Sequence, residues 1–181
     1  LRRQRQMCIR DSFLPNYVQP SNNFSAIWVE GAGVNNKGTY HFDGYNDFLE
    51  LQKSPLYDFK KSNEFTIAVW VNLETYDQTA GTFKRVISKD GGGNPEINLY
   101  YQANDKTWRA WLRGSDGKYD YVKVTDENAL GNWRFLVMRY KPNKILDLTI
   151  PGVGQQNKTT LNTGEFYSNN NFILGKDSQL N

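Results

Sequence analysis

Residues 65–71 of the chain read Phe65-Thr-Ile-Ala-Val-Trp-Val71, and this run decides the fold class. Successive side chains of a strand point to opposite faces, so Phe65, Ile67 and Val69 share one face. The run is rich in β-branched and aromatic residues, which are enriched in β-sheets. The spacing therefore predicts a β-strand with one apolar face.

Similar runs recur on both sides of this one. Between them lie turn residues such as Asp43-Gly44, Asp116-Gly117 and Gly131-Asn132, which accept the positive φ angles of tight reversals. The further runs are Thr39–Phe42, Phe48–Leu51, Arg85–Ser88, Ile97–Tyr101, Trp108–Arg113, Tyr119–Val124, Trp133–Tyr140, Ile145–Ile150 and Phe172–Leu174. No segment keeps a 3.6-residue apolar period over three turns. The pattern predicts an all-β, two-sheet antiparallel β-sandwich.

This pattern also predicts a set of largely buried apolar side chains. The set is Phe42, Phe65, Ile67, Val69, Leu99, Trp133, Phe135 and Leu174. We favour a core position for Trp70 as well. Trp133, Phe135 and Val137 share one face of their run and Leu136, Met138 and Tyr140 the other, which indicates a strand that is apolar on both faces.

Five segments, taken in chain order, resemble a known family. They are Tyr40-His-Phe-Asp-Gly-Tyr-Asn-Asp-Phe-Leu-Glu-Leu51, Phe65–Val71, Val86-Ile-Ser-Lys89, Leu130-Gly-Asn-Trp-Arg-Phe-Leu-Val-Met-Arg-Tyr140 and Phe172-Ile-Leu-Gly175. Their order and spacing resemble bacterial and viral laminin G-like domains of the concanavalin A-like lectin/glucanase superfamily, which implies a jelly roll. Such domains close with a further strand after the last segment, so we expect that closing strand to be missing. Thr39–Phe42 would then lack a partner on one side unless residues 23–30 supply it.

The chain is expected to have three parts. Residues 2–12 can be written codon by codon as a transposase-type sequencing adapter, so we expect residues 1–12 to be a non-native segment of a metagenomic fragment rather than a natural basic tail. Residues 13–38, with Pro15 and Pro20, are expected to be a linker or the end of a preceding module. Residues 39–181 are expected to form the laminin G-like β-sandwich.

Composition narrows the function classes. The chain has 22 Lys and Arg against 19 Asp and Glu; four arginines and one aspartate lie in residues 1–12, which leaves 18 of each sign. Residues 13–181 therefore have no net formal charge, and this balance does not indicate nucleic-acid binding. The only cysteine, Cys8, also lies in residues 1–12, so the body has no thiol nucleophile or thiolate metal ligand. The sequence has no run of 18 apolar residues, so it does not predict a membrane-spanning segment.

The sequence does not indicate an enzyme. Glycoside hydrolases of the superfamily use a Glu-x-Asp-x-x-Glu strand, which places carboxylates on one face. Here Glu64 is followed two residues later by Thr66, and Glu96 by Asn98. The only histidine, His41, has no serine, cysteine or carboxylate partner that the sequence places beside it.

Two candidate sites remain. Trp111, Tyr119 and Tyr121, with Arg109 and Arg113, are candidates for carbohydrate binding, because aromatic rings pack against the apolar faces of sugars. Alternation puts Trp111 on the face of the two arginines, although a core position for it is equally favoured. The oxygen-rich turn with Asp43, Asn46 and Asp47 is a candidate calcium site. The alternative is that these residues only cap backbone amides.

The sequence therefore predicts a non-catalytic, lectin-like recognition module for carbohydrate binding or adhesion. We expect it to belong to a larger extracellular, cell-surface or virion protein that binds carbohydrate or a glycoconjugate, with calcium as the one candidate cofactor. A structural or protein-interaction domain of a phage or surface protein stays an alternative. A diverged glycoside hydrolase is a further one.

Overall fold

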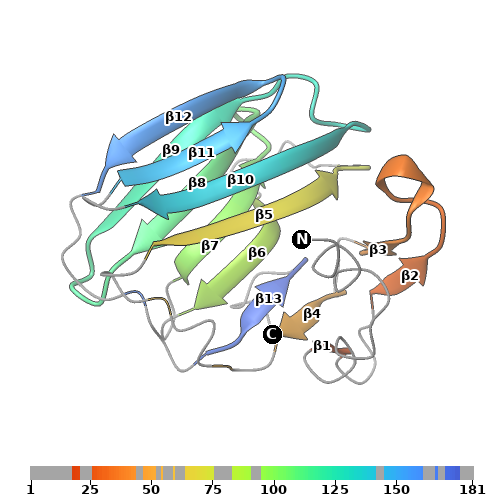
Figure 1. Ribbon diagram of the computed structural model, residues 1–181, viewed down its shortest axis with the longest axis horizontal. Helices are drawn as coiled ribbons and strands as arrows, with labels where there is room; N and C mark the ends of the chain where they lie inside the picture. The colour runs from red at the N-terminus through yellow and green to blue at the C-terminus, as the bar shows by residue number, and fades with distance from the viewer. Residues whose placement is uncertain are drawn as a thin grey trace.

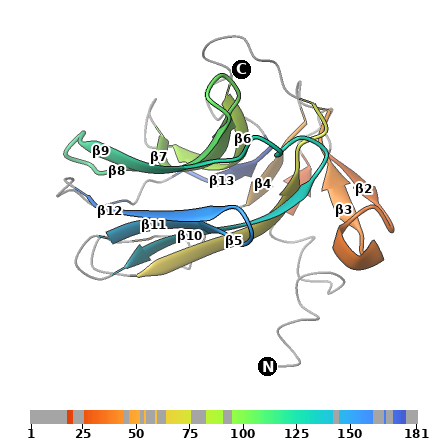
Figure 2. The ribbon, with the colours of Figure 1, turned by 90° about the horizontal axis from the view of Figure 1, so that it is seen from above.

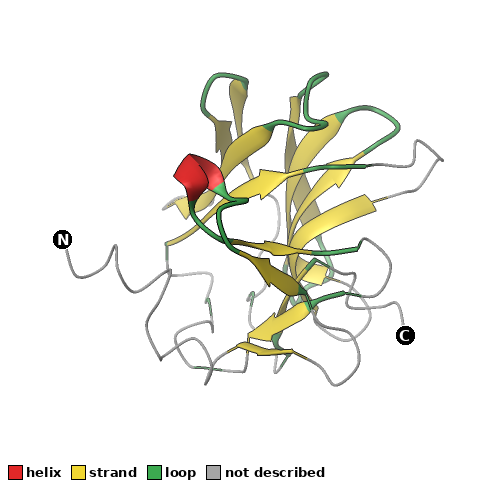
Figure 3. Cartoon of the chain, turned by 90° about the vertical axis from the view of Figure 1, so that its right-hand side faces the viewer, coloured by secondary structure: helices red, strands yellow, loops and turns green. Residues whose placement is uncertain are grey.

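The computed structural model describes residues 18–20, 26–43, 47–51, 54, 59, 64–75, 83–90, 95–141, 145–160, 166 and 170–175. Strands account for almost all of their regular structure, and a 3-10 turn, Val34–Asn36, is the one helical element drawn in Figure 3. Among the described residues, no helix has the length and apolar character that a membrane crossing requires.

Two antiparallel sheets pack face to face (Figures 1 and 2), which confirms the predicted sandwich. The larger sheet has the order β1-β4-β13-β6-β7-β8-β9. Its strands are β1 (Val18–Pro20), β4 (Leu49–Leu51), β13 (Phe172–Leu174), β6 (Phe83–Asp90), β7 (Pro95–Gln102), β8 (Thr107–Arg113) and β9 (Tyr119–Thr125). The smaller sheet has the order β12-β11-β10-β5. Its strands are β12 (Gly154–Thr159), β11 (Ile145–Ile150), β10 (Trp133–Lys141) and β5 (Phe65–Asn72).

The core lies between these sheets and is built by alternation. Strands β7 and β8 turn Leu99, Trp108 and Leu112 inward, while β10 and β11 supply Leu136 and Leu148 from the other side. All five side chains are completely buried. Alternate apolar residues of both sheets therefore meet to form the core.

The predicted core set is confirmed only in part. Phe65 and Leu99 are buried, whereas Phe42, Ile67, Val69, Trp133, Phe135 and Leu174 are partly buried. Trp133 and Phe135 point outward because Leu136, Met138 and Tyr140 take the inner face of β10. The core position favoured for Trp70 is wrong. Its ring is 49% exposed and stacks on Phe135 on the outer side of the smaller sheet, with the ring centres 5.0 Å apart.

The segment before residue 39, expected as a linker or the end of a preceding module, contains two short strands. Val18–Pro20 pairs with Leu49–Leu51 as the edge of the larger sheet. A separate two-stranded ribbon joins β2 (Ile27–Val29) to β3 (Thr39–His41). β2, which lies within the predicted run at residues 23–30, thus supplies a partner for β3. Residues 1–12 and residues 176–181 lie outside the described residues, so the predicted non-native segment and the predicted missing closing strand stay predictions.

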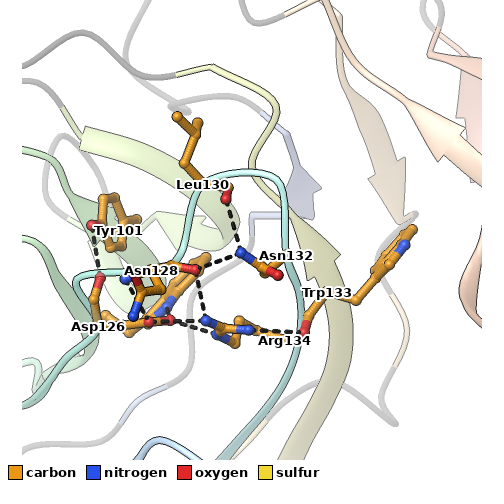
Figure 4. Close-up of polar contacts among 8 residues, drawn as sticks. Tyr101, Asp126, Asn128, Leu130, Asn132, Trp133 and Arg134 are labelled. Carbon is orange, nitrogen blue, oxygen red and sulfur yellow. Dashed lines mark hydrogen bonds and ion pairs between the residues drawn. The ribbon is translucent and has the colours of Figure 1, made fainter.

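A buried carboxylate ties the end of β9 to both sheets (Figure 4). Asp126 accepts hydrogen bonds from the indole N–H of Trp108 at 3.0 Å and from Nε of Arg134, in the smaller sheet, at 2.6 Å. Its backbone carbonyl accepts a third hydrogen bond from the hydroxyl of Tyr101 at 3.2 Å. This network fixes the turn that carries the chain from one sheet to the other.

Candidate functional site

The five residues predicted as a carbohydrate site lie on the side of the larger sheet that faces away from the core. We call this side, over strands β6 to β9, the outer face (Figure 2). On β8, Trp108, Ala110 and Leu112 are completely buried, so the alternate residues Arg109, Trp111 and Arg113 point outward. On β9 the exposed residues include Tyr119 and Tyr121. The structure thus brings all five predicted residues onto one surface.

The centre of the outer face is a stack of three aromatic rings. Trp111 lies parallel to Tyr119, with ring centres 4.4 Å apart, and to Tyr121, with centres 5.9 Å apart. Trp111 is directly opposite Tyr121 in the β8–β9 register. Tyr119 is 55% exposed and Tyr121 37% exposed, while the indole ring is partly buried beside them. Of the two positions left open for Trp111, the structure therefore selects the outer one.

Arg109 packs against one ring of this stack. Its guanidinium lies over the Tyr121 ring, 5.2 Å from the ring centre, and forms an ion pair with Asp105. Burial tends to raise the pKa of the Asp105 carboxyl, but hydrogen bonds from Thr107 and Arg109 outweigh it and hold that pKa below its ordinary value. Lys123 approaches the same carboxylate at 3.6 Å. Arg109 is therefore already committed to a partner within the protein.

Arg113 is different. It is directly opposite Tyr119 in the β8–β9 register and two residues from Trp111 on the same face. Its side chain is partly buried, yet the guanidinium forms no hydrogen bond or ion pair with the residues that the structure describes. Of the two predicted arginines, this is the one whose donors are available to a ligand.

Strand β7 adds a row of buried polar side chains to the outer face, which the sequence analysis did not predict. Asn98, Tyr100 and Gln102 alternate with the core residues of this strand and are only 3%, 4% and 4% exposed. The side-chain oxygens of Asn98 and Gln102, and the indole nitrogen of Trp111, are buried without a hydrogen-bond partner in the described structure. The signal was present in the sequence, because Asn98 and Gln102 occupy alternate positions beside an apolar set.

The predicted calcium turn has a clear local role. The backbone N–H of Asp43 donates to Oδ2 of Asp47 at 3.0 Å, and the N–H of Asp47 donates to Oδ1 of Asp43 at 3.3 Å. Asn46 lies outside the described residues. Within the described part of the chain, no three His, Cys, Asp or Glu residues form a group that could hold a metal. The calcium site stays a prediction.

The single histidine has a carboxylate neighbour that the sequence did not reveal. Nε2 of His41 lies 3.1 Å from Oε2 of Glu74, and both side chains are well exposed. This contact joins β3 to the residues just after β5. In the described structure no serine hydroxyl contacts His41, so the pair is not part of a catalytic triad there.

Comparisons with known proteins agree with this architecture. A family model described as the concanavalin A-like lectin/glucanases superfamily matches residues 42–181. No curated protein sequence matches the chain significantly.

Three solved structures illustrate the fold. The binding domain of Paraclostridial Mosquitocidal Protein 1 has a TM-score of 0.71 at 14% identity, over 89% of this chain and 40% of that one. The botulinum neurotoxin serotype G binding domain has a TM-score of 0.61 at 14% identity, over 86% and 40%. The serotype D ligand-binding domain in complex with N-acetylneuraminic acid has a TM-score of 0.65 at 10% identity, over 91% and 43%. The chain thus spans about two fifths of these neighbours, and at such identities the likeness is one of fold.

Proposed function

Because the chain belongs to the concanavalin A-like lectin/glucanases superfamily, we propose that it is a non-catalytic recognition module that binds carbohydrate through the outer face. The stack of Trp111, Tyr119 and Tyr121 carries this proposal, since it offers two exposed aromatic rings on a rigid pair of strands. A pyranose presents an apolar face and a rim of hydroxyl groups. Aromatic rings beside unpaired polar atoms match both features.

The residues that follow Glu96 on β7 support a binding role. On β7, the outward residue two positions after Glu96 is Asn98, where a hydrolase of this superfamily would need a second acidic group. The neighbouring solved structures are described as binding domains, and one of them holds N-acetylneuraminic acid. These descriptions are consistent with recognition rather than chemistry.

The proposal includes a setting in a larger extracellular, cell-surface or virion protein. The similar solved chains are longer than this one and include toxin binding domains, which supports such a setting. A recognition module of this kind acts by presenting a preformed surface. The other domains of the longer protein would then be brought to the bound glycan.

Glycan binding tests the proposal directly. The whole chain would be screened against immobilised neutral and acidic glycans, and we expect selective binding. Tyr119→Ala and Tyr121→Ala should each weaken it about tenfold, because each removes one stacking ring. Tyr40→Ala is the matched control, since Tyr40 is 37% exposed, as Tyr121 is, but lies on the β2–β3 ribbon. If no glycan binds, or if all three variants lose binding equally, the proposal is wrong.

A second candidate function is protein interaction, and the β2–β3 ribbon favours it. Ile27, Trp28, Val29 and Tyr40 are 62%, 41%, 37% and 37% exposed, so both faces of the ribbon present apolar side chains to solvent. Exposed apolar surface of this kind marks contact sites in many proteins. Self-association that Trp28→Ala abolishes, in the absence of glycan binding, would favour this role. Release of reducing ends from polysaccharides would instead reveal a diverged glycoside hydrolase.

A further inference from the structure

We infer that the saccharide recognised on the outer face is acidic, and that Arg113 binds its anionic group. This inference deepens the proposed function and rests on it. Three observations carry it: the charge balance of the face, the unoccupied donors of Arg113, and the buried polar atoms beside Trp111.

The outer face carries more positive than negative charge. Strands β6 to β9 direct four basic side chains to this side, namely Arg85, Arg109, Arg113 and Lys123. The opposing carboxylates are Glu96 on β7 and Asp105 in the β7–β8 turn. The turn after β8 adds Asp116 and Lys118, one residue of each sign. The remaining positive charge favours an anionic ligand over a neutral one.

Internal contacts distinguish Arg113 from the other three cations, since Arg85 lies over the Phe83 ring, 5.6 Å from the ring centre. Arg109 and Lys123 share Asp105, so both already have an acidic partner. Arg113 has none among the described residues, although its side chain is partly buried at the edge of the aromatic stack. A partly desolvated guanidinium without an acceptor gains more from binding a carboxylate or sulfate than a fully hydrated surface lysine does.

The unpaired buried atoms extend the same match. The indole N–H of Trp111 is a donor that lacks an acceptor. Trp111 lies two residues before Arg113, on the same face of β8. Opposite Trp111 on β7, Asn98 has a side-chain oxygen that lacks a donor. An acidic sugar supplies both complements: its anionic oxygens accept hydrogen bonds, and its hydroxyl groups donate them, directly or through a water molecule.

The register gives the ligand an orientation. Arg113 and Tyr119 are directly opposite each other on β8 and β9, so a sugar ring packed on Tyr119 lies within reach of the guanidinium. The ring would cover the exposed tyrosine while its anionic substituent turns toward Arg113. Arg113 is then the residue that discriminates acidic from neutral sugars, and the tyrosines bind both.

The test compares acidic with neutral oligosaccharides on the whole chain. Titrations with 3′-sialyllactose and a sulfated disaccharide form the two acidic arms, and lactose forms the neutral arm. We expect at least one acidic sugar to bind about tenfold or more tightly than lactose, and Arg113→Gln to remove that difference, because a charge-assisted hydrogen bond is lost. Lys37→Gln removes the same charge from an exposed residue beside the β2–β3 ribbon and should change nothing.

Each outcome has a distinct meaning. Lactose binding as tight as the acidic sugars would overturn the inference and leave the proposed function standing. An equal loss in Lys37→Gln and Arg113→Gln would also overturn it, because general charge attraction would then account for the preference. If no glycan bound, the proposed function would fail and the inference with it. A melting curve of Arg113→Gln that matches the unsubstituted protein keeps misfolding from mimicking the expected loss.

Discussion

The indole N–H of Trp108 donates a hydrogen bond to the carboxylate of Asp126 across 3.0 Å, and both residues are almost completely buried. Trp108 belongs to the inner face of β8, whereas Asp126 lies directly after β9. Arg134 of β10 binds the same carboxylate from the smaller sheet. One side chain therefore receives donors from both layers of the sandwich, and its removal should be felt by the whole fold.

Asp126→Ala should destabilise the protein by about 3–5 kcal/mol, because it leaves a largely buried guanidinium and a buried indole N–H without an acceptor. Urea unfolding at neutral pH measures the loss. Glu127→Ala is the control, since Glu127 pairs with Lys106 where both side chains are well exposed, and it should cost less than about 1 kcal/mol. Equal losses in the two variants would contradict the role given to Asp126.

Acid should lower the free energy of unfolding by protonating the carboxyl groups of Asp126 and Asp147. Burial tends to raise the pKa of each carboxyl, but hydrogen bonds from Arg134 and Trp108 to Asp126, and from Gln155 and Arg139 to Asp147, outweigh it and lower both pKa values.

A carboxyl with a lowered folded-state pKa contributes stability that is complete above its unfolded value, near 3.8, and is lost as the pH falls through the folded value. The urea concentration at the midpoint of unfolding should therefore decrease mainly as the pH drops below about 4. Asp126→Ala should flatten part of this dependence. A loss of stability centred near about pH 6 would contradict this account, since neither carboxyl titrates there in either state.

Truncation of two aromatic residues of β5 should destabilise the protein to very different degrees. Phe65 is 6% exposed and packs between Phe59, at 4.4 Å between ring centres, and Tyr140, at 5.8 Å. Phe65→Ala should cost about 3–5 kcal/mol. Trp70→Ala, at a residue that is 49% exposed, should cost no more than about 1.5 kcal/mol. Denaturant titrations of the two variants check the assignment of inner and outer faces, which a larger loss for Trp70→Ala would reverse.

The calcium prediction is tested by thermal unfolding. A ligand that binds the folded state raises its melting temperature by mass action, so about 5 mM calcium should stabilise the chain. Asp47→Ala should abolish that rise. The same variant should lower the melting temperature without calcium as well, because Oδ2 of Asp47 accepts the N–H of Asp43. If calcium left the melting temperature unchanged, only this capping role would remain.

Several strands of both sheets follow from alternation and turn residues alone. The bounds predicted for Ile145–Ile150 and Phe172–Leu174 match the structure, and those around β7, β8 and β9 differ by one or two residues. Apart from the short β13, these strands carry mainly apolar residues on one face and more polar residues on the other. The period of the pattern then identifies both the strand and the side that enters the core.

Other elements could not be predicted this way. β12 reads Gly-Gln-Gln-Asn-Lys-Thr and is a strand only because β11 supplies its hydrogen-bond partners at the edge of the smaller sheet. In β10 both faces are apolar, so the sequence fixes which residues share a face but not which face is inward. The prediction of a core position for Trp70 is wrong, and alternation itself sets this residue on the face opposite Phe65. Which face is buried depends on the second sheet.

The candidate site shows the same division. Alternation correctly put Trp111 beside Arg109 and Arg113. Alternation could not show that Arg109 forms an ion pair with Asp105, because that pair depends on the path of the β7–β8 turn. It also gave no measure of how deeply Asn98 and Gln102 are buried, since that depends on the height of the side chains around them.

The position of β13 has a consequence for how the protein is made. β13 lies between β4 and β6, so residues 49–51 join the larger sheet only through residues 172–174. During synthesis the ribosome must release almost all of the described chain before this gap can close. Until then β4 and the β6 edge expose unpaired backbone groups, the state in which nascent sheets associate wrongly. Newly made chains should therefore depend on chaperones until β13 has emerged.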